Sequence, residues 1–298
     1  MFCNFDEMLQ YASKLGTQKV ALVGSEDEEG LRALKKAQDL GIAEPILVGD
    51  KEKTSQICEK VELDCEIIDA SDSVEAAEKG VKAIRNNKAQ ILMKGLVKTS
   101  ILLKAVLNKE WGLRKGELLS HLAVLDVPAM DRLIFVSDGG MVIRPDINEK
   151  VEIINNAVSF MNNIGYENPR VALLAAVEVV NESMPETLEA AAISKMAQRR
   201  QLKNCEIDGP LALDNALSEM AAKIKKISGS VAGNADLLVV PDIHSGNILG
   251  KSAIYLAGGT IAGIILGATV PIVIVSRADV ARSKLASLAL SAISATKN

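Results

Sequence analysis

Aromatic residues are scarce in this chain of 298 residues, at 3% of the total, with one tryptophan and three tyrosines. Sites that stack nucleic-acid bases or sugars rely on aromatic side chains, so both kinds of site are poorly provided for here. Neither sign of charge dominates either, because 34 basic residues stand against 38 acidic ones, for a formal net charge of -4. Proteins that neutralise nucleic-acid phosphates are usually strongly basic. We therefore expect no nucleic-acid partner.

Histidine and cysteine, the side chains of most transition-metal sites, are also few. The two histidines are His121 and His244, and the four cysteines have a spacing that fits neither a CxxC redox pair nor a zinc knuckle. We expect no metal site. The first residues carry acids and lack the basic and then apolar pattern of a secretory signal, which together with the cysteine content favours a reducing cytoplasm.

The run from Ser252 to Ser276 contains no charged residue and is long enough to be considered as a membrane span. Its glycines at 259, 263 and 267 are four apart, as on one face of a closely packed helix. The run ends in PIVIV, which is typical of a buried parallel strand. We therefore predict a buried helix followed by a strand, and no association with a membrane.

The composition, 48% hydrophobic and 24% charged, indicates a large core, and the length favours about two domains. Short apolar runs predict strands at 19–23, 45–49, 65–69, 90–94, 121–125, 132–136, 170–175, 236–240 and 271–275. Helical spacing predicts helices at 28–40, 73–86, 100–107, 147–164, 185–198 and 211–224. This alternation indicates an α/β fold of parallel sheets. We place one domain at 1–128 plus 270–298 and the second at 129–269.

Active sites of such sheets lie beyond the carboxyl ends of the strands, where loops lead into helices. The common phosphate-binding and hydrolase motifs are missing there: no GxGxxG follows the first strand, and the chain has neither a P-loop nor a GxSxG elbow. The loop after the first strand instead carries four acids in five residues, which would repel a pyrophosphate.

We call a loop that follows the carboxyl end of a strand an exit loop. Two exit loops in the first half of the chain carry candidate residues. In MKGLVKTS, Lys94 ends a strand, and Thr99 or Ser100 can cap the next helix, so a cation would lie beside a helix N-terminus that attracts anions. An ordinary loop with surface lysines is the alternative. In SDGGMVIRP, Asp138 precedes two glycines, which let a ligand approach the backbone or simply make a turn.

Two further loops follow strands in the second half. PDIHSGN crowds polar groups at a strand exit, namely Asp242, His244, Ser245 and Asn247, although Ser245 can also be only a helix cap. In SRAD, Ser276 and Asp279 have the spacing of a capping box. Arg277 between them has a guanidinium suited to binding an anion through paired donors.

Read in order, these loops and their neighbours resemble the phosphate acetyl/butyryltransferases, most closely the butyryl branch. The resemblance rests on MKGLVKTS, LLSHLAVLDVP, DRLIFVSDGGM, PRVALLAAVEVVN, DGPLALDNAL, AGNADLLVVPDIHSGN and PIVIVSRAD, and it is densest from Ile91 to Ala289. It implies reversible transfer of an acyl group from coenzyme A to inorganic phosphate. It also implies two α/β domains of the isocitrate/isopropylmalate dehydrogenase-like type with the site in a cleft between them, and a homodimer or larger homo-oligomer.

For this reaction we expect the loop residues Ser276, Arg277 and Asp279 to be catalytic. We expect the other loop residues to bind substrate, namely Lys94, Thr99, Asp138, Asp242, His244 and Asn247. No cofactor is expected, since coenzyme A is itself the substrate or product. The chain departs from the family at the base proposed for the acetyl branch, seven residues after the serine, where it has Ser283. Asp279 is the nearest acid, and the identity of the base stays open.

Two alternatives remain at this point. The first is an oxidoreductase like 4-hydroxythreonine-4-phosphate dehydrogenase on the same fold, which needs a divalent metal and a nicotinamide, and the second is a non-catalytic acyl-CoA binding protein. The sequence does not fix the acyl-chain preference, the oligomer size or the direction of the reaction.

Overall fold

The computed structural model describes residues 2–116, 118–274 and 281–296, and the chain divides into two compact units. One, here called the split unit, is built from Phe2–Leu119 and Ala262–Asn298. The other, the middle unit, is Ser120–Ile261. The boundaries expected from the sequence, at 128/129 and 269/270, lie nine and eight residues further along the chain.

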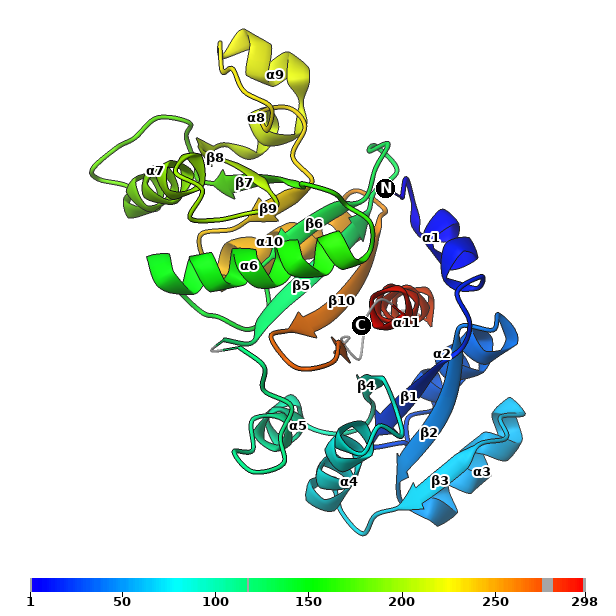
Figure 1. Cartoon of the computed structure of the whole chain (residues 1–298). Helices are drawn as coiled ribbons and strands as arrows, with labels where there is room; N and C mark the ends of the chain where they lie inside the picture. The colour runs from blue at the N-terminus through cyan, green and yellow to red at the C-terminus, as the bar shows by residue number, and fades with distance from the viewer. Residues whose placement is uncertain (1, 117, 275–280, 297–298) are drawn as a thin grey trace. The chain divides into compact units, whose positions relative to one another are not determined.

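The split unit is a mainly parallel sheet with its helices (Figure 1). Its strands lie in the order β3-β2-β1-β4-β11-β10, and only the β10–β11 pair is antiparallel. Their bounds are β1 Gln18–Val23, β2 Ala43–Gly49, β3 Glu66–Asp69, β4 Ile91–Lys94, β10 Thr260–Leu266 and β11 Ile272–Val273. The helices are α1 Phe5–Ala12, α2 Glu28–Asp39, α3 Lys51–Val61, α4 Ser73–Arg85, α5 Thr99–Val106 and α11 Ala281–Ala295.

Aspartates start two helices of this unit by accepting backbone N–H groups that have no partner within the helix. Asp50 accepts the N–H of Lys53, and Asp72 accepts those of Val74 and Glu75. In the centre, β1 is fully buried from Val20 to Val23, as expected for a strand covered on both faces. Helix α11 is buried over most of its length and packs against α1 and α2.

The middle unit has strands in the order β5-β6-β9-β7-β8, of which only the β5–β6 pair is antiparallel. They are β5 Ser120–Asp126, β6 Ile134–Ser137, β7 Arg170–Leu174, β8 Glu206–Leu211 and β9 Leu237–Val239. Its helices are α6 Ile147–Asn163, α7 Pro185–Gln198, α8 Leu213–Leu217, α9 Glu219–Ile224 and α10 Ile243–Tyr255. Helices α6 and α10 both pack on β5 and β6, and Figure 1 shows α6 in front of these strands and α10 behind them.

The α/β fold of mostly parallel sheets is confirmed, and each predicted strand has an observed counterpart. The prediction of a helix over the glycines at 259, 263 and 267 is wrong, because Thr260–Leu266 forms β10. Gly258 and Gly267 instead have φ of +67° and +89° at the two ends of that strand, where the left-handed conformation favours glycine. The predicted helix at 211–224 is two short helices, α8 and α9.

Strand β8 was not predicted, and the chain folds Gly209 and Pro210 into it. Proline lacks the N–H needed inside a sheet, but β8 is the edge strand of the middle unit, where proline is tolerated. Within the described ranges, no helix combines the length and apolar character needed to cross a membrane.

Candidate functional site

In the middle unit, the polar loop after β9 leads directly into α10. Asp242 is the N-cap of α10, and its Oδ1 accepts both the N–H and the O–H of Ser245, each at 2.8 Å. The idea that Ser245 caps this helix is therefore wrong, since Ser245 is the donor. The hydrogen bond from the Ser245 N–H lowers the pKa of the Asp242 carboxyl below its ordinary value, although desolvation opposes the shift.

The loop after β6 lies against the first turn of α10. A Cβ atom on Gly139 would come within 2.9 Å of the Gly246 carbonyl carbon, so the two backbones touch with no room for a side chain. A Cβ atom on Gly140 would lie 2.9 Å from Cγ of the His121 ring. The paired glycines thus bring two exit loops of the sheet together.

Asp138, in the same loop, is 3% exposed and holds the backbone around it. Its Oδ2 accepts the N–H of His121 at 2.7 Å, and its Oδ1 accepts those of Gly140 and Met141 at 2.8 Å each. A carboxylate with three backbone donors stabilises the loop and repels a phosphate anion. These contacts favour a role in positioning the loop over direct contact with substrate.

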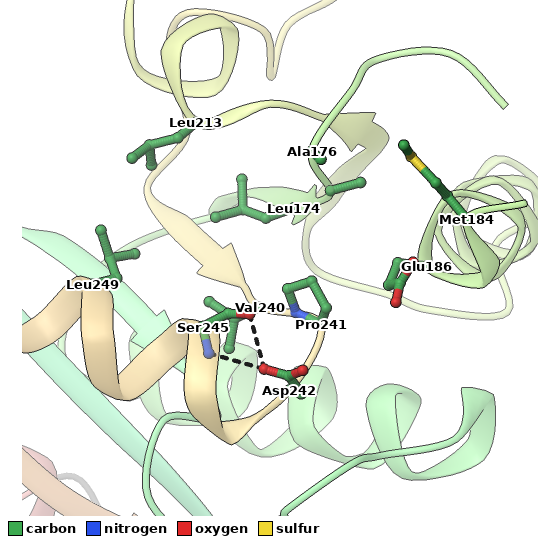
Figure 2. Close-up of a pocket in the computed structure, with 11 residues that line it drawn as sticks. Leu174, Ala176, Met184, Glu186, Leu213, Val240, Pro241, Asp242, Ser245 and Leu249 are labelled. Atoms are coloured by element: carbon green, nitrogen blue, oxygen red, sulfur yellow. Dashed lines mark hydrogen bonds between the residues drawn. The ribbon is translucent and has the colours of Figure 1, made fainter. Parts of the chain in front are cut away.

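A mainly apolar pocket of about 480 Å³ lies beside the N-terminus of α10 (Figure 2). Leu174 ends β7, Met184 precedes α7, Leu213 opens α8, and Val240 and Leu249 come from the β9 exit and α10. The polar groups on its wall are Asp242, Ser245 and the Glu186 carboxylate. The pocket therefore lies at the carboxyl ends of β7 and β9, where ligands bind in open α/β sheets.

The structure brings only part of the PDIHSGN loop to this pocket. Asp242 and Ser245 line it, whereas His244 and Asn247 are exposed on the first two turns of α10 and are not among its lining residues. The sequence did not single out Leu174, Met184 or Leu213, because they come from three separate elements. Leu213 lies in DGPLALDNAL, one of the segments that carry the family resemblance, so this segment could have pointed to Leu213 as a site residue.

In the split unit, Lys94 is the last residue of β4 and is 8% exposed, and its Nζ donates to the carbonyl of Gly95 at 3.2 Å. Thr99 is the first residue of α5. The N-cap is Lys98 and makes no side-chain capping bond, so the prediction that Thr99 or Ser100 caps this helix is wrong. Gly95 packs on the loop after β1: a Cβ atom there would lie 2.3 Å from the carbonyl oxygen of Gly24.

The three proposed catalytic residues, Ser276, Arg277 and Asp279, lie outside the described residues. Ser283, which stands where the acetyl branch has its proposed base, belongs to α11 and is 3% exposed. In the part of the chain that the structure covers, no three His, Cys, Asp or Glu side chains are grouped as a metal site would require.

Comparisons with known proteins agree over most of the chain. The family described as phosphate acetyl/butaryl transferase matches residues 70–292. The phosphate butyryltransferase of Clostridium beijerinckii is 45% identical over 298 residues, which cover 99% of each chain. The crystal structure of a branched-chain phosphotransacylase from Enterococcus faecalis is 31% identical, with a TM-score of 0.83, and the match covers 94% of this chain and 100% of that one.

A more distantly similar enzyme shares the fold. The crystal structure of 4-hydroxythreonine-4-phosphate dehydrogenase from Klebsiella pneumoniae has a TM-score of 0.60 at 14% identity, covering 93% of this chain and 99% of that one. This likeness concerns the fold alone.

Proposed function

Since the chain belongs to the phosphate acetyl/butyryl transferase family, we propose that it transfers a short acyl group between coenzyme A and inorganic phosphate. The observation that carries the proposal is the 45% identity to a phosphate butyryltransferase over 99% of both chains. The geometry supports it with an apolar pocket at the carboxyl ends of β7 and β9, beside a helix N-terminus.

In the proposed reaction, a phosphate oxygen attacks the thioester carbonyl carbon. A C–O bond forms, the C–S bond breaks, and coenzyme A leaves as a thiolate that takes up a proton. Catalysis requires phosphate to be held close to the thioester and the oxyanion to be stabilised. By resemblance we assign these tasks to Ser276 and Arg277, with Lys94 as a further cation for phosphate.

The base for the reverse reaction must withdraw the thiol proton of coenzyme A. Ser283 does not suit this task, because a serine hydroxyl is not a base near neutral pH and this one is buried in α11. We therefore propose Asp279, the nearest acid in the sequence.

We further propose that the acyl chain lies in the apolar pocket and that butyryl is preferred to acetyl. An acetyl group has one methyl carbon to bury, whereas a butyryl chain has three aliphatic carbons that gain from leaving water. A pocket of about 480 Å³ has room for the longer chain together with the adjoining part of the pantetheine arm.

A homo-oligomer and a cytoplasmic location stay predictions from the sequence.

The test is the release of free thiol from butyryl-CoA and from acetyl-CoA, each with and without phosphate, in excess EDTA. We expect release only with phosphate, undiminished by the chelator, and a higher kcat/KM for butyryl-CoA. Activity that vanishes in EDTA and returns with Mg²⁺ would contradict the metal-free mechanism. Binding of acyl-CoA without any thiol release would favour the non-catalytic alternative, and reduction of NAD followed at 340 nm would favour the oxidoreductase.

A further inference from the structure

A second pocket, here called the basic pocket, lies wholly within the split unit. It has a volume of about 590 Å³, within the usual range of small-molecule sites. Arg85, the last residue of α4, contributes one wall, and the loop after α5 contributes Lys109, Arg114 and Lys115. The acyl transfer proposed for this chain assigns no role to these residues.

Positive charge predominates among the described residues of this wall. Of the described residues that line the pocket, four are cationic, and Glu110 is acidic. In the described part of the chain, no carboxylate forms an ion pair with Arg85, Lys109 or Lys115. This contrasts with the helix lysines of the same unit, such as Lys79 and Lys82, which pair with acids one turn away.

Backbone hydrogen bonds tie the loop that carries the cations to the turn before β11. The N–H groups of Lys115 and Gly116 donate to the carbonyl of Gly267 at 3.1 and 3.2 Å, and Thr269 donates to Leu113 at 2.7 Å. Gly112 fits so closely that a Cβ atom would lie 2.3 Å from the carbonyl oxygen of Asn108. A site fixed before a ligand arrives pays less ordering entropy on binding.

The two arginines are anchored at the pocket in a similar way. Nη1 of Arg85 donates to the carbonyl of Gly112 at 3.4 Å, and Nε of Arg114 donates to that of Gly116 at 2.8 Å. The bond of Arg85 uses one of the five N–H groups of its guanidinium, a planar group suited to phosphate oxygens.

The basic pocket lies at the opposite end of β4 from Lys94. Arg85 ends the helix that precedes β4, whereas Lys94 is the last residue of the strand. The turn that begins at Gly267 leads into β11, which runs parallel to β4, so this turn also lies at the amino-terminal end. The pocket is therefore separate from the exit loop that carries Lys94.

A tryptophan adjoins the cations. Trp111 lies between two residues that line the pocket, Glu110 and Gly112, and the ammonium of Lys82 is 5.5 Å from the centre of its ring. It is the only tryptophan of the chain, so its fluorescence reports on this place alone.

We propose that the basic pocket binds a diphosphate group. A diphosphate carries charge on two neighbouring phosphates, which suits several fixed cations around one cavity better than a single phosphate does. Such a group occurs in inorganic pyrophosphate, in a nucleoside diphosphate and in coenzyme A, and the pocket chemistry is the same for all three. The proposal does not rest on the acyl transfer proposed above.

The experiment titrates the full-length protein with pyrophosphate and with ADP, following Trp111 fluorescence and, in parallel, the heat of binding at constant ionic strength. We expect saturable binding of both, and at least about tenfold weaker binding of inorganic phosphate. The double variant Lys109→Gln/Lys115→Gln should raise the Kd for pyrophosphate at least about tenfold, because it removes two charge-assisted contacts. Both side chains are exposed, so folding should be unaffected, which unfolding curves check.

The matched control is Lys60→Gln, which removes an exposed cation from α3, outside the pocket. It should leave the Kd for pyrophosphate unchanged. Equal binding of phosphate and pyrophosphate, or an unchanged Kd in the double variant, would overturn the proposal. Because no turnover is involved, failure of the acyl-transfer assay would leave this result standing.

The source of the diphosphate follows from one more measurement on the same variant. If the KM for butyryl-CoA rises along with the Kd for pyrophosphate, the pocket holds the diphosphate of coenzyme A. If that KM is unchanged while pyrophosphate binding is weakened, the pocket holds a separate effector.

Discussion

Gly139 and Gly246 pack backbone against backbone, so that a Cβ atom on Gly246 would lie 2.6 Å from the Cα of Gly139. The contact joins the loop after β6 to the first turn of α10, and the apolar pocket is lined from that same turn by Ser245. Glycine at these two positions is therefore a condition for the observed arrangement of the site.

Gly246→Ala should destabilise the protein, because the new methyl group would collide with backbone atoms, which cannot move aside by a change of rotamer. We expect a loss of about 1 to 3 kcal/mol in the free energy of unfolding, measured by urea denaturation. Gly250→Ala, one turn later in α10, is the matched control, since its Cβ atom would have its nearest contact at 3.4 Å, with Cδ1 of Ile261. It should gain up to about 1 kcal/mol from helix propensity. Equal effects of the two substitutions would contradict the packing argument.

Leu213→Phe should shift the acyl preference by filling part of the apolar pocket. The side chain of Leu213 is 40% exposed, so a larger ring is accommodated without disturbing the core. We expect the ratio of kcat/KM for butyryl-CoA to that for acetyl-CoA to fall about tenfold, since each lost methylene contact is worth about 1 to 3 kcal/mol. Met220→Phe on α9, at 72% exposure and outside the pocket, should leave the ratio unchanged. The same ratio in both variants would place the acyl chain elsewhere.

Arg277→Lys keeps the charge but loses the planar fork, so it should lower activity without affecting folding. Losing one charged hydrogen bond to an anion corresponds to a fall of roughly ten- to a hundredfold in kcat/KM. Arg282→Lys is the control, because Arg282 forms an exposed ion pair with Asp6 at 3.0 Å. Such pairs contribute about 0 to 1 kcal/mol. Wild-type rates in Arg277→Lys and in Arg277→Ala would remove Arg277 from the site.

The Asp242 cap should make part of the stability depend on pH. Because the folded state lowers the pKa of this carboxyl, the cap contributes fully above its ordinary value of 3.8, and the contribution is lost as the pH falls below it. Asp242→Asn retains an acceptor that does not titrate, so the difference in unfolding free energy between wild type and this variant should shrink between about pH 5 and pH 3. Asp242→Ala should cost about 0.5 to 2 kcal/mol at neutral pH. A difference independent of pH would show that the carboxylate charge is unimportant.

Local signals allowed several elements to be predicted from the sequence with good accuracy. Helix α7 has the predicted bounds, Pro185 to Gln198, because proline suits the first turn and the apolar spacing continues behind it. The run TIAGIIL was misassigned because its glycine spacing imitates a helix face, while its isoleucines favour the strand that forms. Strand β8 contains a Gly-Pro pair that reads as a turn, and only its place at an edge makes it a strand.

Only the part of the site that lies within one continuous segment of the chain could be predicted from the sequence. The helix cap lies within PDIHSGN, so the sequence limits the capping residue to a few candidates. It does not tell whether the Asp242 carboxylate or the Ser245 hydroxyl accepts the backbone N–H. The apolar pocket combines Leu174, Met184 and Leu213 from separate elements, which meet only through the pairing of β7 with its neighbours. The contacts of Asp138 likewise depend on His121, from another strand.

The split unit has a consequence for the order of events during synthesis. Its first part, Phe2–Leu119, emerges from the ribosome before the middle unit, but β11 begins only about 180 residues after the end of β4. At roughly 5 to 20 residues per second, the edge of β4 that pairs with β11 waits about 9 to 36 seconds for its partner strand. The middle unit is one continuous segment and can fold during that interval. We therefore expect chains arrested before residue 262 to contain a protease-resistant middle unit and an N-terminal portion that recruits chaperones through its uncovered strand.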